Sequence, residues 1–182
     1  MQTLCFTGHR KINGKYDGPD HIALRNHLAD VVHRASEFGI LNFISGGALG
    51  VDQLAAEAVI HEQGTRHPEI NLIIARPFAS QACKWPAASQ RRLAVIETHA
   101  FKVHDCFPDP YKVWKMQGRN VWMVNQSNIV VAVWDGKRSG GTWNCVEYAF
   151  ECMKTQDMKV LVIHPTLLTE TWYSGPTKEV AA

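Results

Sequence analysis

The sequence predicts an α/β protein with a Rossmann-like fold, in which a mostly parallel sheet has helices on both faces. The first observation is that strand-like and helix-like segments alternate along most of the chain. The second is that several strand-like segments, such as LIIA, IVVAVW and VLVI, are apolar throughout and rich in β-branched residues. Strands of this kind are buried on both faces, which is typical of a parallel sheet between two layers of helices.

The expected elements follow from apolar spacing and from helix start and stop signals. The first expected helix begins at Pro19 and is closed by Gly39, with apolar residues at helical spacing between them. The helix that follows the SGGALG loop has its apolar residues on one side. Expected strands cover 2–6, 41–44, 71–75, 101–104, 129–134 and 159–163, and expected helices cover 19–38, 51–63, 84–99, 117–126 and 142–153.

Length and composition predict one globular domain. The chain has 182 residues, of which 46% are hydrophobic and 20% are charged, so it can bury a core without disulfides to hold it. We expect a single domain over 1–182, with its core over about 3–163 and a weakly patterned tail over 164–182. No apolar run reaches the length of a membrane span and no secretory signal is evident, so we expect a soluble, cytoplasmic protein without a membrane partner.

Cysteine pattern and charge narrow the classes of function. The five cysteines include no CxxC pair, and the chain has no HExxH motif and no Cys/His cluster at ligand spacing. We therefore expect reduced thiols, no metal and no other cofactor. The net charge is +2 and the basic residues are scattered, so nucleic acid is not expected as a partner, whereas a small anionic ligand fits.

The segments that follow the expected strands hold the candidate binding residues, because parallel α/β sheets bind ligands beyond the carboxyl ends of their strands. Two of these segments are rich in glycine, SGGALG over 45–50 and SGGT over 139–142, and each precedes an expected helix. Amides at a helix N-terminus favour an anion such as phosphate, although one such turn is equally consistent with a tight connection capped by Asp52. Two loops at one sheet edge favour a nucleotide or sugar-phosphate site.

Two arginines, a glutamate and a histidine are further candidates. Arg10 directly follows the strand-end Thr-Gly of FTGHR, where a guanidinium can bind phosphate oxygens bidentately. Arg119 is either a second phosphate contact or a solvated side chain. Glu147 is either a surface carboxylate or, if its helix faces the cleft, a base or a ribose ligand. His9 is either a ligand contact or a turn residue.

Four motifs, taken in their order, resemble the YpsA-like family of the SLOG (SMF/DprA-LOG) superfamily. They are FTGHR, SGGALGVDQLAAEA, PFASQACKW and RNVWMVNQSNIVVAVWDGKRSGGT, and the match spans residues 3–163. The resemblance implies a Rossmann-like fold that binds nucleotides or nucleotide-derived, ADP-ribose-like ligands. It also implies a homo-oligomer.

The expected ligand-binding residues lie at the strand ends and on one later helix. They are Thr7, Gly8, His9, Arg10, Ser45, Gly46, Gly47, Gly50, Asp52, Pro77, Phe78, Asn120, Gly140, Gly141 and Thr142. Thr7, Gly8 and Arg10 would contact one end of the ligand, and the two glycine loops would surround its phosphate. Asp52 or Glu147 would meet ribose or order the loops.

Two branches of the superfamily give alternatives to a binding or sensing role. The LOG branch consists of phosphoribohydrolases that cut the N-glycosidic bond of nucleoside monophosphates. Arg119, Asn120, Met123 and Glu147 resemble its motifs, which makes Arg119 and Glu147 the catalytic candidates, but the carboxylate follows GGT by five residues instead of three. The DprA branch shares an SGxAxGxD element and binds single-stranded DNA. We rank nucleotide binding first, an N-glycosidase second and a DNA accessory third.

Overall fold

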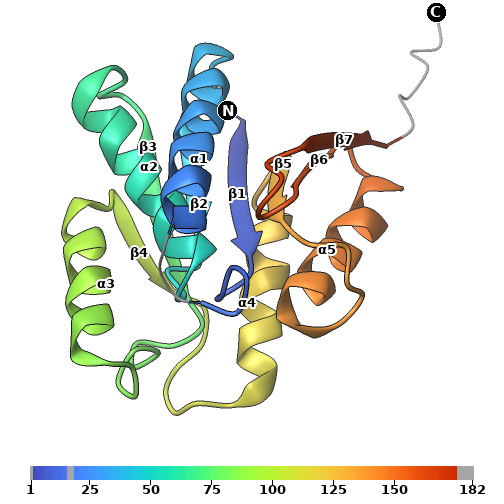
Figure 1. Ribbon diagram of the computed structural model, residues 1–182. Coiled ribbons are helices and arrows are strands. Elements are labelled where there is room, and N and C mark those ends of the chain that lie inside the picture. Colours follow the sequence, from blue (N-terminus) through green and yellow to red (C-terminus); the bar gives the residue numbers. More distant parts are fainter. Residues whose placement is uncertain (1, 16–18, 176–182) are drawn as a thin grey trace, which may run out of the picture.

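The computed structural model describes residues 2–15 and 19–175 as one seven-stranded sheet between two layers of helices (Figure 1), which confirms the predicted α/β, Rossmann-like class. The elements are β1 (Thr3–Gly8), α1 (Pro19–Glu37), β2 (Asn42–Ser45), α2 (Val51–Thr65), β3 (Asn71–Arg76), α3 (Ala87–His99), β4 (Lys102–Asp105), α4 (Val113–Asn125), β5 (Ile129–Val133), α5 (Gly140–Met153), β6 (Lys159–Ile163) and β7 (Glu170–Ser174). None of the helices in the described ranges is long and apolar enough to cross a membrane.

The order of the strands places a topological switch point at the centre of the sheet. The order is β4-β3-β2-β1-β5-β6-β7, and all neighbouring strands are parallel except the β6–β7 pair, which is antiparallel. After β1 the chain builds outward to β4, and it then returns to the other side of β1 as β5. The carboxyl ends of β1 and β5 therefore flank the switch point, where open α/β sheets bind ligands.

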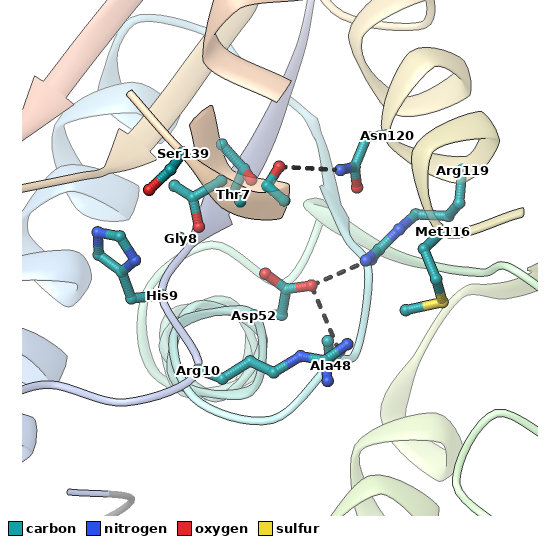
Figure 2. Close-up of a pocket in the computed structure, with 13 residues that line it drawn as sticks. Thr7, Gly8, His9, Arg10, Ala48, Asp52, Met116, Arg119, Asn120 and Ser139 are labelled. Carbon is teal, nitrogen blue, oxygen red and sulfur yellow. Dashed lines mark hydrogen bonds and ion pairs between the residues drawn. The ribbon is translucent and has the colours of Figure 1, made fainter. Parts of the chain in front are cut away.

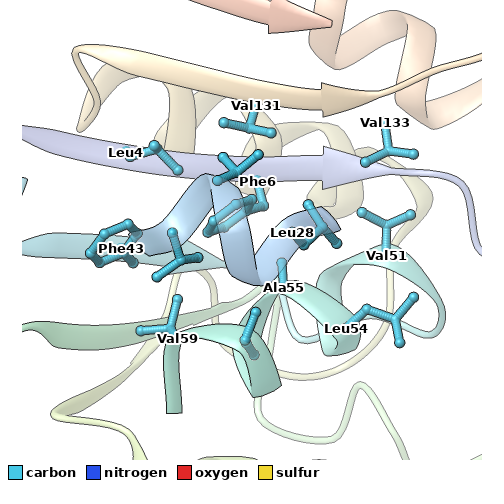
Figure 3. Close-up of a cluster of buried hydrophobic side chains, with 14 of the residues drawn as sticks. Leu4, Phe6, Leu28, Phe43, Val51, Leu54, Ala55, Val59, Val131 and Val133 are labelled. Atoms are coloured by element: carbon cyan, nitrogen blue, oxygen red, sulfur yellow. The ribbon is translucent and has the colours of Figure 1, made fainter. Parts of the chain in front are cut away.

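Two apolar layers cover the two faces of the sheet. The first joins the sheet to α1, α2 and α3 (Figure 3), and in it the fully buried rings of Phe6 and Phe43 stack with their centroids 6.3 Å apart. The second joins the sheet to α4 and α5 and includes Met123, Val130 and Cys145. Burial from both sides explains why β5 is apolar at every position and why β1 has the apolar run Leu4–Phe6 at its centre.

Three helices begin at residues other than those expected, and the smallest difference is at α5, which begins at Gly140 and not at 142. Helix α3 begins at Ala87 and not at 84, because Pro86 disfavours helical geometry in the residue before it. Helix α4 begins at Val113, four residues before the expected start at 117. Its first turn therefore lies outside the range that was expected to be helical.

The structure also contains a strand that the sequence analysis did not predict. Residues Glu170–Ser174, which were expected to belong to a weakly patterned tail, form β7 and pair with β6, with Trp172 opposite Leu161. Most side chains of β7 are exposed. An exposed edge strand of this kind lacks the continuous apolar run that marks the buried strands.

Candidate anion-binding site

A cavity of about 290 Å³ lies at the switch point, beyond the carboxyl ends of β1 and β5 (Figure 2). Its walls come from the segments after these two strands, from the start of α2 and from one face of α4. The lining residues are Thr7, Gly8, His9, Arg10, Ala48, Asp52, Met116, Arg119, Asn120, Ser139, Gly140, Gly141 and Thr142. The folded chain thus brings residues from four separate segments to one site.

The segment after β1 is held against the start of α2. The amide of Val51 donates a hydrogen bond to the carbonyl oxygen of His9 at 3.2 Å. Glycine is needed at both contact points, because a Cβ on Gly8 would lie 2.6 Å from the Cβ of Val51, and Gly50 has a φ of 84° and faces the backbone of Arg10. These contacts fix the backbone of Arg10 at the rim, while its side chain stays exposed.

The SGGALG loop uses several of its polar groups on itself and on α2. The amide of Gly47 donates to Ser45 Oγ at 3.2 Å, and the amide of Ala48 donates to Asp52 Oδ2 at 3.3 Å. The Ser45 hydroxyl donates to the carbonyl oxygen of Asp52 at 2.6 Å. Within the loop Ala48 lines the cavity. The loop geometry therefore serves above all to position Asp52.

A buried ion pair joins α4 to α2 at the cavity. Nη1 of Arg119 donates to Oδ2 of Asp52 at 3.0 Å, and the two side chains are only 7% and 8% exposed. Gly46 makes room for the guanidinium, because a Cβ there would lie 1.0 Å from Nη1. Among the residues that the structure describes, Nε of Arg119 has no hydrogen-bond partner. A buried hydrogen-bond donor without an acceptor costs free energy of folding, so this guanidinium is suited to donate to a further, anionic partner.

Burial also affects Asp52. It raises the pKa of the Asp52 carboxyl above its ordinary value, although Arg119 and the Ala48 amide oppose the rise. Burial of the charged carboxylate therefore costs free energy, which its contacts with Arg119 and the Ala48 amide offset in part. Protonation of Asp52 would leave the positive charge of Arg119 uncompensated in the cavity.

The first turn of α5 forms another wall. Its N-cap residue Ser139 makes no side-chain capping hydrogen bond, and Gly140 has a φ of 80°. The first amides of a helix have no acceptor within the helix, and the helix dipole makes this end positive. The side-chain amide of Asn120 donates to the carbonyl oxygen of Gly141 at 3.4 Å, which links α4 to this turn. The arrangement favours an anion.

His9 is anchored at the end of β5. Its Nε2 lies 3.3 Å from the amide nitrogen of Asp135 and 3.2 Å from Oδ1 of the same residue. A neutral His9 accepts the amide proton, and a protonated His9 pairs with the carboxylate. Both forms keep the imidazole at the wall between the β1 and β5 segments.

The structure separates the candidate residues of the sequence analysis into two groups. The residues that line the cavity are Thr7, Gly8, His9, Arg10, Asp52, Arg119, Asn120, Gly140, Gly141 and Thr142. The residues that do not line it are Ser45, Gly46, Gly47, Gly50, Pro77, Phe78 and Glu147. Phe78 is buried against Tyr111, with ring centroids 5.8 Å apart, and Glu147 is exposed. The role of each candidate as a ligand contact stays a prediction.

Three lining residues were not among the candidates. Ala48 and Ser139 lie within the two glycine loops but were not singled out. Met116 precedes Arg119 and Asn120 by three and four residues, so the three side chains share one face of α4. That spacing was the signal by which Met116 could have been found.

The fold and the cavity define a Rossmann-like α/β protein with a polar, arginine-lined pocket at its switch point. More specifically, the chain belongs to the YspA SLOG family, whose family model matches residues 4–168. The resemblance inferred from the four sequence motifs is thereby confirmed.

The chain has relatives among bacterial proteins. It is 36% identical over 143 residues to the uncharacterized SPbeta prophage-derived protein YoqJ of Bacillus subtilis strain 168, a match that covers 72% of this chain and 82% of YoqJ. It is 29% identical over 118 residues to the UPF0398 protein ABC2016 of Shouchella clausii, a match that covers 64% of this chain and 61% of the relative.

Two solved structures share the fold. DNA processing protein A from Helicobacter pylori, described for its single-stranded DNA binding mode, superposes with a TM-score of 0.59 at 19% identity. The same protein from Streptococcus pneumoniae superposes with a TM-score of 0.60 at 17% identity. Each match covers 89% of this chain, but only 65% of the first structure and 50% of the second.

These structures correct one expectation. The sequence analysis did not expect nucleic acid as a partner, because the net charge is small and the basic residues are scattered. That exclusion is wrong, because this fold also occurs in a protein that binds single-stranded DNA. The physical reason is that net charge does not describe local charge: folding places Arg10, Arg119 and the start of α5 around one cavity.

Proposed function

We propose that the cavity binds the phosphate group of a nucleotide or of a nucleotide-derived small molecule, in a sensing or sequestering role. The observation that carries the proposal is the state of Arg119. Its guanidinium is buried at the cavity, bonds Asp52 through Nη1, and has an Nε without a partner in the described part of the chain. Arginine binds phosphate oxygens through several parallel N–H donors, so this side chain has donor capacity left for a ligand.

The surroundings of Arg119 support an anion of moderate size. Arg10 at the rim and the first-turn amides of α5 add positive charge from two other directions. The volume of about 290 Å³ is near the lower end of the range for small-molecule sites, which favours a mononucleotide-sized group. A second cavity of about 430 Å³ shares His9 and includes Lys137 and His164, so a longer, ADP-ribose-like ligand would have room to extend.

The hydrolase alternative is less well supported by the geometry. Glu147, its expected carboxylate, is exposed and does not line the cavity. Among the described residues that line the cavity, Asp52 is the one carboxylate, and it is paired with Arg119. A glycosidase of this family would therefore have to use Asp52 in place of Glu147. We rank binding above hydrolysis for this reason.

Single-stranded DNA is the second candidate ligand. The observation that favours it is the shared fold with DNA processing protein A. A phosphodiester offers Arg119 and α5 the same acceptor oxygens as a free nucleotide. The two candidates differ in length, because strand binding engages several phosphates in succession whereas a nucleotide engages one site.

Thermal unfolding and calorimetry with AMP, ADP-ribose, inorganic phosphate and adenosine test the proposal. We expect the phosphorylated compounds to stabilise the protein increasingly as their concentration rises above the dissociation constant, and adenosine to have little effect. Arg10→Ala should weaken binding of AMP by about tenfold or more, which corresponds to one charge-assisted hydrogen bond of ~1.5–3 kcal/mol. Arg25→Ala, at an exposed position on α1 outside the cavity, is the matched control.

The results distinguish the three hypotheses. Equal effects of AMP and adenosine, or unchanged AMP binding by Arg10→Ala, would contradict phosphate recognition. Detection of free base released from AMP by chromatography would support the hydrolase alternative. A single-stranded oligonucleotide that binds more tightly than AMP, and whose affinity falls steeply with salt, would support the DNA reading.

A further inference from the structure

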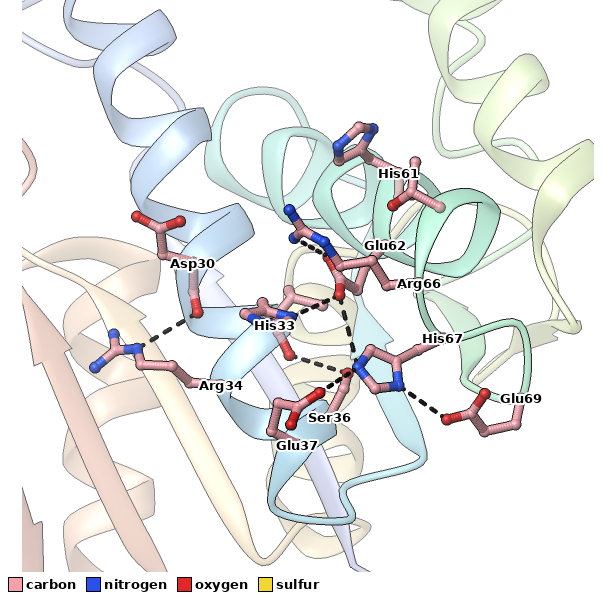
Figure 4. Close-up of polar contacts among 12 residues, drawn as sticks. Asp30, His33, Arg34, Ser36, Glu37, His61, Glu62, Arg66, His67 and Glu69 are labelled. Carbon is pink, nitrogen blue, oxygen red and sulfur yellow. Dashed lines mark hydrogen bonds and ion pairs between the residues drawn. The ribbon is translucent and has the colours of Figure 1, made fainter.

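A second cluster of ionisable side chains lies where the C-terminal half of α1 packs beside the end of α2 (Figure 4), far from the cavity at the switch point. His33 and Glu37 lie one turn apart on α1, Glu62 lies on α2, and His67 and Glu69 follow α2. One donor atom from each of His33, Glu37 and His67 lies within 4.8 Å of the other two.

His67 has a carboxylate at each of its ring nitrogens. Its Nδ1 lies 3.0 Å from Oε1 of Glu69, and its Nε2 lies 2.9 Å from Oε1 of Glu37. Oε1 of Glu62 lies 3.8 Å from the same Nε2. A neutral imidazole has one N–H and one lone pair, so one nitrogen would face a carboxylate oxygen with no proton between them. This geometry needs a cation at one of the contacts, either a proton or a metal ion.

The buried carboxylate of Glu62 is a further reason for a cation in this cluster. Its side chain is 1% exposed, and its oxygens contact Nδ1 of His33 at 2.8 Å and Nη1 of Arg66 at 3.3 Å. A buried carboxylate requires compensation by positive charge. Among these contacts Arg66 is the one permanent cation against the three carboxylates of Glu37, Glu62 and Glu69. The cluster is therefore negative when both histidines are neutral.

We propose that this cluster binds one zinc ion, with His33, Glu37 and His67 as ligands. Two imidazoles and one carboxylate form a known donor set for zinc, with a fourth position left for water or for a further carboxylate such as Glu62. Glu69 accepts the Nδ1 proton of His67 and so leaves Nε2 as the donor to the metal, an arrangement typical of metal-bound histidine.

The distances allow this site with small side-chain movements. Ligand atoms about 2.1 Å from a tetrahedral zinc are about 3.4 Å apart, compared with donor atoms already within 4.8 Å of one another here. The side chains of His33 and Glu37 are 38% and 59% exposed, so they can adjust and the ion can enter from solvent. In effect the ion replaces the protons shared between imidazole and carboxylate.

The sequence does not predict this metal site, because its ligands do not occur at the spacing of a known motif. His33 and Glu37 are four residues apart, but His67 comes from another helix end thirty-four residues further along the chain. Only the packing of α1 against α2 brings the three together.

Isothermal titration calorimetry, in which zinc chloride is added to the metal-free full chain, tests the site. We expect one zinc ion per chain, and at least tenfold weaker binding in His67→Gln and in Glu37→Gln. Glu37 is largely exposed, so its variant should fold normally, which circular dichroism checks. His61→Gln is the matched control, because His61 is exposed on α2 and turned away from the cluster (Figure 4).

Several outcomes would overturn the proposal. They are the absence of saturable zinc binding in the wild type, unchanged affinity in both cluster variants, or an equal loss in His61→Gln. Competition by excess magnesium would also overturn it, because magnesium prefers oxygen ligands and does not replace zinc at imidazole nitrogens. Loss of binding confined to the cluster variants, with magnesium without effect, would support it.

Discussion

At the scale of single residues, the absence of a side chain at Gly46 leaves the space that the guanidinium of Arg119 occupies. The guanidinium occupies the space where a side chain at Gly46 would lie, and from there it reaches both Asp52 and the cavity. The sequence analysis interpreted Gly46 as a phosphate contact. In the structure Gly46 does not line the cavity and instead makes room for Arg119, which does.

We therefore expect Gly46→Ala to damage both stability and binding. The new Cβ would lie 1.0 Å from Arg119 Nη1, so the arginine must leave Asp52. Separation of a buried ion pair costs roughly 3–5 kcal/mol. Urea unfolding should show a loss of about that size, and calorimetry should show no measurable binding of AMP.

Gly64→Ala provides the matched control for this substitution. Gly64 lies inside α2, and a Cβ there would meet no other atom within 4 Å. Alanine favours the helix over glycine by roughly 0.5–1 kcal/mol, so this variant should be slightly more stable than the wild type. A Gly46→Ala protein as stable as Gly64→Ala would show that Arg119 is not confined as the structure indicates.

Asp52 should make anion binding depend on pH. Burial raises its pKa, with Arg119 and the Ala48 amide opposing, so the carboxyl takes up a proton at a higher pH than an exposed aspartate. Protonation removes a negative charge from the cavity, and the affinity for sulfate should therefore rise as pH falls toward this pKa. Sulfate is the suitable probe because its own charge stays constant over this range.

Asp52→Asn tests whether the Asp52 carboxyl is the source of this pH dependence. The variant should bind sulfate at neutral pH at least about fivefold more tightly than the wild type, because a like charge near 4 Å costs about 1 kcal/mol even in water. Its pH profile should be flatter. Because the pKa of Asp52 is higher in the folded than in the unfolded state, the stability that this residue contributes should be lost as pH rises from the unfolded-state pKa through the folded-state pKa. An identical pH profile in variant and wild type would refute the role of Asp52.

At the scale of elements, β7 depends on a polar link to α1. Nη1 of Arg34 donates to Oε2 of Glu170 at 3.2 Å, Nη2 of Arg34 bonds the other oxygen, and Nε2 of His27 lies 2.9 Å from Oε1. This link explains how a strand with mostly exposed side chains holds its place at the sheet edge.

Glu170→Gln should loosen β7. Burial alone would raise the pKa of Glu170, but Arg34 and His27 hold it below its ordinary value. A lowered folded-state pKa means that the link stabilises the protein at neutral pH and that this contribution is lost as pH falls through the folded pKa. We expect a loss of about 0.5–1 kcal/mol at pH 7, discounted because Arg34 is half exposed, and faster amide exchange in residues 170–174.

A surface pair serves as the control for this variant. Glu151 and Lys154 are both largely exposed, so Glu151→Gln should change stability by only a few tenths of a kcal/mol. A Glu170→Gln protein that resembles Glu151→Gln in both stability and exchange would show that β7 is held by its pairing with β6 alone.

At the scale of the whole molecule, the sequence was most informative where burial is uniform. The central strands and the two glycine loops could be predicted, because a parallel sheet needs apolar strands and because its strand ends meet at one edge. The exposed strand β7 could not, since it has no continuous apolar run. The spacing of Met116 from Arg119 and Asn120 indicates a shared face of α4, but only the packing of α4 places that face at the cavity. The cluster of His33, Glu37 and His67 depends on tertiary packing, which no local spacing records.

The same dependence on burial predicts how the core responds to substitution. Phe6 lies at the centre of the sheet, is fully buried and stacks on Phe43, so Phe6→Ala leaves a cavity that the two central strands cannot close. The expected loss is roughly 3–5 kcal/mol, a large part of the total stability of a domain. Phe38→Ala, at a ring that is 85% exposed at the end of α1, should have almost no effect in the same urea titration. A loss in Phe6→Ala as small as that in Phe38→Ala would show that the core does not depend on Phe6 as its burial indicates.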